Sequence, residues 1–199
     1  MICGVSRETE ARLAAFTAEL RRWNPRINLV SRATLDQLES RHLVDSAQLF
    51  PLRPGGAQHW ADLGTGAGFP GLVIAILAAE TAPQLRVTLV ESDRRKAAFL
   101  AAAARAAGVT PTIHATRIET LAPLNADVLS ARALAPLGQL LAHVYRHMDP
   151  NGRALLPKGA RHDAEIAEAL ATWRFTVQKI PSRTDPAGAI LAIEGVTRA

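Results

Sequence analysis

The sequence predicts an α/β fold, with seven strands in a mostly parallel sheet, an antiparallel hairpin at the C-terminal end and a helical extension at the N-terminal end. From residue 59 onward, short apolar runs alternate with helical patterns, which is typical of βαβ units. A glycine-dense turn joins the first apolar run to the first of these helices. The last two apolar runs, 173–180 and 189–196, are too close for a crossover helix, so we expect them to pair antiparallel.

The leading segment 1–58 is expected to be helical and part of the same globular unit. Ser6 is placed as an N-cap, and Leu13, Phe16, Leu20 and Trp23 follow on one helical face. The pair Asn24-Pro25 is expected to end this helix. Residues 34–37 have the pattern of a capping box, which predicts the start of a second helix that ends before Pro51.

Residues 59–199 form the predicted sheet domain. Strands are expected near 59–63, 86–90, 111–115, 127–131, 153–157, 173–180 and 189–196, and helices near 71–80, 93–107, 136–148 and 162–171. Gly108 stands where the C′ residue of a helix belongs, and residues 149–152, with the sequence DPNG, are expected to form a turn.

Composition limits the class of protein. A chain of 199 residues with 48% hydrophobic residues can bury the core of one ordinary domain. No apolar run is long enough to span a membrane, no signal peptide is visible, and Cys3 alone can form neither an internal disulfide nor a metal cluster. We therefore expect a cytoplasmic, monomeric protein without a metal.

The net charge of +5 favours a polyanionic partner such as RNA. Arginine outnumbers lysine 20 to 3, so coding bias is an alternative source of the charge. Four arginines follow one another without an intervening acidic residue between Glu19 and Asp36. They are Arg21, Arg22, Arg26 and Arg32, and together with Asn28 they are candidates for binding RNA phosphates; a solvated turn is the alternative.

The segment 62–71, DLGTGAGFPG, is the most informative stretch of the sequence. Gly64, Gly66 and Gly68 allow the backbone to approach a ligand at the start of a helix. Residues 66–71 also satisfy the dinucleotide pattern G-x-G-x-x-G. However, a pyrophosphate would be repelled by Asp62, and the pattern that begins at Asp62 resembles the first motif of class I methyltransferases that use S-adenosylmethionine (SAM). In that family an acidic residue at the strand end serves the amino acid moiety of the cofactor, so the resemblance makes Asp62 a cofactor-binding candidate. A turn that binds no ligand is the remaining alternative.

Further candidates follow the next strands, at the edge where open α/β sheets bind ligands. Glu91 ends the second strand and can accept hydrogen bonds from two ribose hydroxyls; a helix-capping acid is the alternative. Ile118 can pack on an adenine ring, and Glu119 or its backbone can bind the edge of that ring. Alternatively, Glu119 forms a surface ion pair with Arg117.

The fourth strand ends at Arg132, which can hold a cofactor carboxylate or the target base, or form a salt bridge. Enzymes that methylate exocyclic amines carry an Asn/Asp-Pro-Pro-aromatic tetrad here, and methylation of pyrimidine C5 needs a cysteine; both are absent. A purine N7 or another unprotonated heteroatom remains, for which positioning matters more than a general base. Lys158 is a candidate contact to phosphate or to a guanine edge; a solvated side chain is the alternative. His42 and Asp45 share a helical face, where a structural hydrogen bond is the alternative to a role in the site.

Several segments together resemble one family, the bacterial 16S rRNA guanine-N7 methyltransferases known as RsmG or GidB. They are 23–31 (WNPRINLVS), 42–46 (HLVDS), 62–71, 90–92 with Lys96, Phe99 and Leu100, 117–119, 130–133 (SARA) and 158–159. The resemblance implies a class I, Rossmann-like methyltransferase that converts SAM to S-adenosylhomocysteine while methylating a guanine N7 in the 530 loop of 16S rRNA on a ribosomal particle.

By position, the resemblance also implies cofactor contacts and substrate-positioning residues. The cofactor contacts are Gly64, Phe69, Ile118, Glu119 and Arg132, with Glu91 near the ribose. Arg132, Lys158, Arg117, Asp45 and His42 are the candidates for positioning the substrate. Two other interpretations remain open, a small-molecule SAM methyltransferase and a non-catalytic RNA-binding module.

Overall fold

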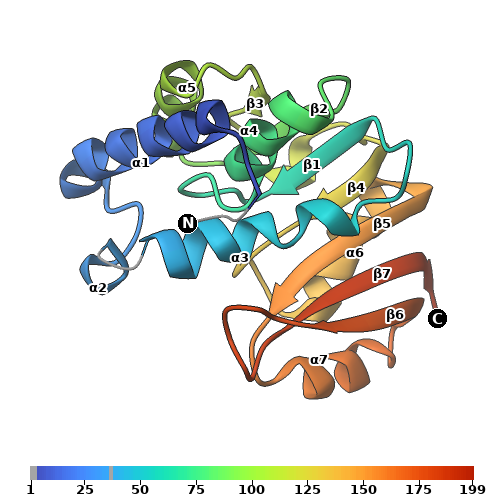
Figure 1. Cartoon of the computed structure of the whole chain (residues 1–199). Helices are drawn as coiled ribbons and strands as arrows, with labels where there is room; N and C mark the ends of the chain where they lie inside the picture. Colours follow the sequence, from blue (N-terminus) through green and yellow to red (C-terminus); the bar gives the residue numbers. More distant parts are fainter. Residues whose placement is uncertain (1–3, 36–37) are drawn as a thin grey trace.

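The structure is a computed structural model that describes residues 4–35 and 38–199 (Figure 1). Seven strands form one sheet in the order β3-β2-β1-β4-β5-β7-β6. The strands are β1 (His59–Leu63), β2 (Arg86–Val90), β3 (Thr112–His114), β4 (Ala126–Ser130), β5 (Met148–Lys158), β6 (Trp173–Pro181) and β7 (Ala189–Arg198). Strands β1 to β5 pair in parallel, whereas β7 is antiparallel to both β5 and β6. The predicted mostly parallel sheet with a C-terminal hairpin is confirmed.

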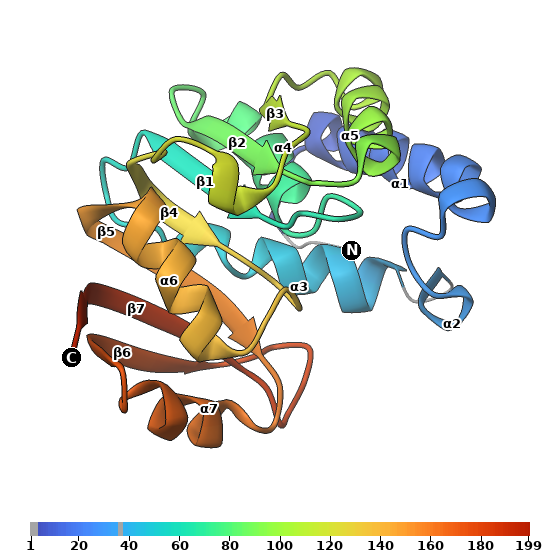
Figure 2. The same cartoon turned by 180° about the vertical axis from the view of Figure 1, so that it is seen from behind.

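Helices cover both faces of the sheet. They are α1 (Arg7–Ile27), α2 (Arg32–Leu35), α3 (Val44–Ala47), α4 (Gly71–Thr81), α5 (Arg94–Ala106), α6 (Leu137–His147) and α7 (His162–Ala169). Figure 1 views the molecule from the side of α1 and α3, and Figure 2 from the side of α6. Apolar residues of α1, α4 and α5 share one core cluster, while those of α6 share another with Trp173.

Alternate residues of the central strands enter the two cores. Trp60 and Val128 pack in the cluster under α4, whereas Leu63 and Leu129 pack in the cluster under α6. This division follows from the period of two along a strand. It also explains why the strands are apolar throughout, because a parallel sheet is buried on both faces.

The predicted end of α1 was wrong. The N-cap Ser6 is confirmed, but the helix continues through Pro25 to Ile27. A proline near the end of a helix removes only one backbone donor. Asn24 stabilises the following turn, since its side chain bonds both the N–H and the C=O of Val30, and Asn28 caps the helix in the left-handed conformation with φ 49°.

The second predicted helix is divided into short pieces. It begins at Arg32, so Thr34 lies inside a helix and is not its N-cap; residues 36–37 of the predicted capping box lie outside the described residues. A π-helix (Leu38–Leu43), α3 and a 3-10 helix (Phe50–Leu52) follow. The predicted apolar face holds, because Leu38, Leu43 and Leu49 are all buried.

The predicted turn at 149–152 lies within β5 instead of before it. The strand begins at Met148, and the register with β4 shifts between Ala126 and Val128, so the extra residues form a bulge. Asp149 accepts a hydrogen bond from the N–H of Asn151, as in an Asx turn. Other predicted boundaries agree within two residues, and Gly108 (φ 65°) follows α5 as expected. A further short 3-10 helix (Ile118–Thr120) follows β3.

Candidate active site

The turn after β1 contains three glycines whose backbone is in the left-handed region. Gly64, Gly66 and Gly68 have φ of 66°, 57° and 89°. The N–H groups of Gly64 and Thr65 donate to the carbonyl of Val90, which ties the turn to the end of β2. A Cβ on Gly68 would lie 3.0 Å from Leu72 and 3.3 Å from Phe16, so this glycine serves the packing of α1 and α4.

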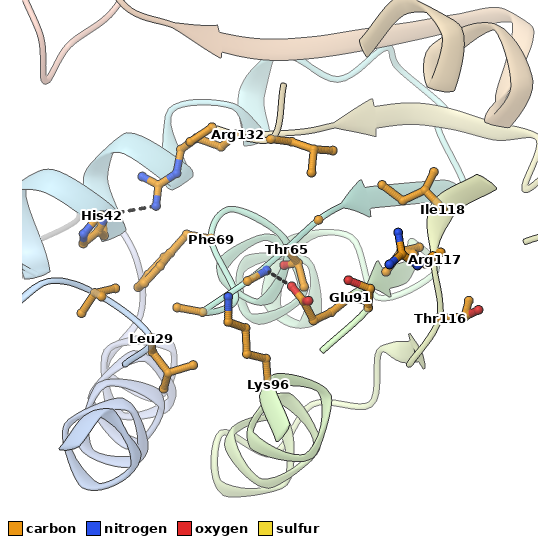
Figure 3. A pocket seen from close by; sticks show the side chains of 18 of the residues that line it. Leu29, His42, Thr65, Phe69, Glu91, Lys96, Thr116, Arg117, Ile118 and Arg132 are labelled. Atoms are coloured by element: carbon orange, nitrogen blue, oxygen red, sulfur yellow. Dashed lines mark hydrogen bonds between the residues drawn. The ribbon is translucent and has the colours of Figure 1, made fainter. Parts of the chain in front are cut away.

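The turn borders a cavity of about 540 Å³, which we call the glycine-loop cavity (Figure 3). Its walls come from the loops after β1, β2, β3 and β4 and from the segment between α1 and α2. They include Leu29, Val30, Ser31, Thr34, His42, Gly64, Thr65, Gly66, Phe69, Glu91, Ser92, Lys96, Thr116, Arg117, Ile118, Glu119, Arg132 and Leu134. The cavity thus lies at the carboxyl ends of the strands, beside the switch point where β1 has β2 on one side and β4 on the other.

Glu91 is held at the centre of this cavity. One carboxylate oxygen accepts from Gly66 N–H at 2.9 Å and the other from Asp93 N–H at 2.8 Å. Each oxygen retains a second lone pair. Asp93, not Glu91, caps helix α5, so the helix-capping alternative for Glu91 is wrong.

Asp62 lies under the glycine turn and does not reach the cavity. It is fully buried; one oxygen accepts from Ser130 Oγ at 2.6 Å and the other from Gly71 N–H at 2.9 Å. Ser130 Oγ in turn accepts from Trp60 Nε1 at 2.9 Å. Asp62 therefore fixes the start of α4 against β4, and any effect on a ligand is transmitted through the turn.

Burial raises the pKa of Asp62 to about 6, against the opposing effect of its hydrogen bonds. Because the folded protein holds this proton more tightly than the unfolded chain, its contribution to stability is largest below pH 4 and falls as the pH rises to about 6. The free energy of unfolding is expected to fall by about 1.4 kcal/mol per pH unit over this range, about 3 kcal/mol in total.

We expect Asp62→Asn to remove this pH dependence of the free energy of unfolding, measured by urea unfolding between pH 4 and 8. Glu168→Gln on exposed α7 should keep the wild-type dependence. Parallel curves for Asp62→Asn and wild type would contradict the assignment.

The end of α6 contacts the segment 118–121, which follows β3, on the side away from the cavity. Ile118 is buried and lines the cavity, and its carbonyl lies 3.1 Å from Nε2 of the fully buried His147. Burial lowers the pKa of His147, so the neutral ring that donates to this carbonyl is favoured. Arg146 donates to the carbonyl of Leu121. Glu119 lies 3.8 Å from His143, and no pairing with Arg117 is found within the described part of the chain.

Arg132 joins the leading segment to the end of β4. Its Nη1 donates to Asp45 at 3.0 Å, and its Nη2 lies 3.0 Å from Nδ1 of His42. The His42 ring stacks on Phe69 at 4.9 Å, and the Arg132 guanidinium lies 5.4 Å from the same ring. Asp45 also accepts from Thr184 at 2.7 Å. The structure therefore brings together residues of three motifs that are separate in the sequence, namely 42–46, 62–71 and 130–133.

A second cavity of about 750 Å³ lies beyond Arg132. It shares Thr34, His42, Arg132, Ala133 and Leu134 with the glycine-loop cavity. Ala133 is left-handed (φ 52°), an uncommon conformation for a residue with a Cβ. Arg132 thus stands in the wall between the two cavities.

Lys158 lines the second cavity, and its side chain is only 9% exposed. Its ammonium donates to Glu165 at 2.7 Å and to the carbonyl of Ala135 at 2.9 Å. Burial raises the pKa of Glu165, but the hydrogen bonds from Lys158 and from Leu137 N–H outweigh this and lower it. Lys158 is therefore a fixed wall residue and not a solvated lysine.

Four of the N-terminal candidates for RNA binding are absent from the walls of both cavities: Arg21, Arg22, Arg26 and Asn28. Arg21, Arg22 and Arg26 are exposed on α1, and Arg22 pairs with Glu19 at 2.6 Å. Asn28 is exposed at the C-cap of α1, and the side chain of Arg32 is outside the described residues. The neighbouring residues Leu29, Val30 and Ser31 line the glycine-loop cavity, which sequence analysis missed because they carry no charge or pattern that marks a ligand.

Among the residues that the structure describes, no helix is long and apolar enough to cross a membrane. Within the same residues, no group of three or more His, Cys, Asp or Glu side chains is arranged to hold a metal ion.

Several of the solved structures that superpose on this chain are titled as methyltransferases. The ribosomal protein L11 methylase of Lactobacillus delbrueckii subsp. bulgaricus superposes with a TM-score of 0.60 at 18% identity, covering 75% of this chain and 76% of that one. A TehB-like SAM-dependent methyltransferase of Corynebacterium glutamicum gives 0.59 at 15% identity, with 94% and 100% covered. The predicted class is confirmed: the chain has the class I methyltransferase fold.

The chain belongs to the rRNA small subunit methyltransferase G (GidB) family, whose family model matches residues 9–188. Curated relatives named Ribosomal RNA small subunit methyltransferase G are 51% identical in Ruegeria sp. (strain TM1040), over 98% of this chain and 94% of that protein, and 51% identical in Rhodospirillum centenum, over 97% and 87%. The family predicted from the sequence segments is therefore confirmed.

Proposed function

We propose that this protein transfers a methyl group from SAM to N7 of a guanine in the 530 loop of 16S rRNA. The observation that carries the proposal is the position of Arg132 in the wall between two cavities, one bordered by the glycine turn and Glu91, the other large enough for a nucleobase. The names of the curated relatives support small-subunit rRNA as the substrate. The choice of N7 and of the 530 loop rests on the resemblance of the motifs.

The residues of the glycine-loop cavity fit SAM. A Cβ on Gly66 would approach only the carbonyl of Gly64, at 3.8 Å, so the turn opens onto free space. Glu91 retains lone pairs for two ribose hydroxyls, and Ile118 offers an apolar surface for the adenine. When bound, SAM supplies an electrophilic methyl group on its sulfonium.

The second cavity is proposed to receive the target base. Guanine N7 has no proton to lose, so the protein needs to align the base and exclude water, and it needs no general base. Arg132, fixed by Asp45 and His42, orients the two ligands at the junction, and Lys158 with Glu165 provides polar contacts on the far wall. The leading segment belongs to the same functional unit, because Leu29 and His42 form part of the walls.

The test is transfer of labelled methyl from SAM to 30S particles from a strain that lacks this gene, followed by mass spectrometry of RNA digests. We expect one labelled guanine N7 in the 530 loop and no label on particles from the parent strain. Label at another nucleotide would overturn the substrate assignment. SAM binding without transfer to any ribosomal particle would favour a small-molecule acceptor, and rRNA binding unaffected by SAM would favour a non-catalytic RNA-binding module.

A further inference from the structure

We propose that Lys96 binds a backbone phosphate of the RNA substrate at the mouth of the glycine-loop cavity, an inference that rests on the proposed function. Lys96 lies in the first turn of α5 and lines the cavity. Figure 3 shows its side chain rising from α5 into the cavity, with Arg117 on the other side of Glu91.

Helix stability does not explain a lysine at this position. The N-terminus of a helix favours acidic side chains, yet the first turn of α5 reads Arg94, Arg95, Lys96 and contains no acidic residue. The N-cap Asp93 compensates one of these charges, through an ion pair of 3.1 Å with Arg95. Among the side chains that the structure describes, none forms a hydrogen bond or ion pair with the ammonium of Lys96, whereas Arg132, in the same cavity, is paired with Asp45.

The cofactor does not account for this charge either. SAM carries a net charge of +1, because its sulfonium adds to a zwitterionic amino acid, so an ammonium in the same cavity that does not contact the carboxylate of SAM repels the cofactor. The polyanion is the other substrate. A phosphate placed against Lys96 would neutralise the ammonium and remove this repulsion.

A basic surface lies next to Lys96, on the last turns of α1 and the first turns of α5. Trp23 of α1 meets Phe99 of α5 edge-on at 6.0 Å, which brings the last turns of α1 beside the first turns of α5. These turns carry the exposed side chains of Arg21, Arg26 and Arg94. An RNA strand that follows this surface would end at Lys96, at the entrance to the cavity.

This placement makes the two substrates cooperate. If bound RNA removes the repulsion between Lys96 and SAM, RNA strengthens SAM binding, and SAM must strengthen RNA binding by the same factor. S-Adenosylhomocysteine has no net charge, so its affinity should not depend on Lys96.

The test compares Lys96→Ala with Lys96→Arg and with the matched control Arg105→Ala. Arg105 lies in the last turn of the same helix, about 14 Å along its axis. Calorimetry on the protein alone measures SAM and S-adenosylhomocysteine. Filter binding to unmethylated 30S particles, with S-adenosylhomocysteine present, measures RNA affinity over a range of salt and does not depend on turnover.

We expect Lys96→Ala to bind SAM about two- to fivefold more tightly with unchanged affinity for S-adenosylhomocysteine. Its affinity for 30S particles should fall about tenfold, with a salt slope shallower by about 0.7–0.9. Lys96→Arg and Arg105→Ala should match wild type. Weaker SAM binding with unchanged RNA affinity would make Lys96 a cofactor ligand, and no change in either would make it a solvated side chain; both overturn the proposal. If wild type binds 30S particles in a Lys96-dependent manner but transfers no methyl, the proposed function fails and the phosphate site stands.

Discussion

Gly66→Asp is expected to weaken SAM binding by about 100-fold or more, equal to about 2.7 kcal/mol, while the protein stays folded. The fold tolerates the change because a Cβ here meets only the carbonyl of Gly64, at 3.8 Å, and because aspartate is among the residues that best accept a left-handed φ such as 57°. The new carboxylate takes up space in the cavity. It also stands beside Glu91, whose oxygen lies 2.9 Å from Gly66 N, so like charges would displace the proposed ribose contact.

Gly108→Asp is the matched control for Gly66→Asp. Gly108 has a similar φ of 65°, and a Cβ there meets nothing within 4 Å, but it follows α5 away from the cavity. Both variants should lose a similar amount of stability in thermal unfolding, about 1 kcal/mol for the left-handed backbone. Calorimetry should then show SAM binding in Gly108→Asp only. Wild-type affinity in a folded Gly66→Asp would refute the assignment of the cavity.

Local patterns in the sequence predicted the elements of the fold. The short apolar runs, the glycine turn and the close spacing of the last two strands are properties of neighbouring residues, and the seven strands follow from them. The leading segment was harder to predict, because Leu38, Leu43 and Leu49 are buried although they do not belong to one continuous α-helix. Their tertiary contacts with the core take precedence over helix periodicity.

The candidate site was predicted in parts, but its pairings were not. Asp45 and Arg132 are 87 residues apart, and nothing local in either motif marks the other as a partner. Lys158 is an isolated lysine in the sequence, and only the fold of α7 brings Glu165 to it. For Asp62, the motif identified an acidic residue at the end of a strand, but the burial that turns it toward Ser130 and Gly71 depends on α4 and β4.

Arg132→Ala is expected to lower kcat/KM for 30S particles by about 100- to 1,000-fold, or about 2.7–4.1 kcal/mol of transition-state stabilisation. The guanidinium uses separate amino groups for Asp45 and His42, and this fork fixes it in the wall shared by the two cavities. Without it, Asp45 keeps its contacts to Gln48 and Thr184, but the alignment of the two ligands is lost. Arg132→Lys should also be impaired, because an ammonium cannot reproduce the planar fork.

Arg153→Ala separates the loss of alignment from the loss of an ion pair. Arg153 pairs with Glu194 at 2.6 Å and donates to the carbonyl of Leu52. It lines neither of the two cavities, so its removal should leave kcat/KM near the wild-type value. In Arg132→Ala, SAM affinity by calorimetry should fall less than about tenfold, since Glu91 and the glycine turn remain, and the loss should appear mainly in kcat. If SAM affinity falls as far as kcat/KM does, Arg132 acts as a cofactor ligand and not at the junction.

A double-mutant cycle with Asp45→Asn measures the coupling between Arg132 and Asp45. If Asp45→Asn restores part of the activity to Arg132→Ala, the unpaired Asp45 carboxylate accounts for that part of the defect.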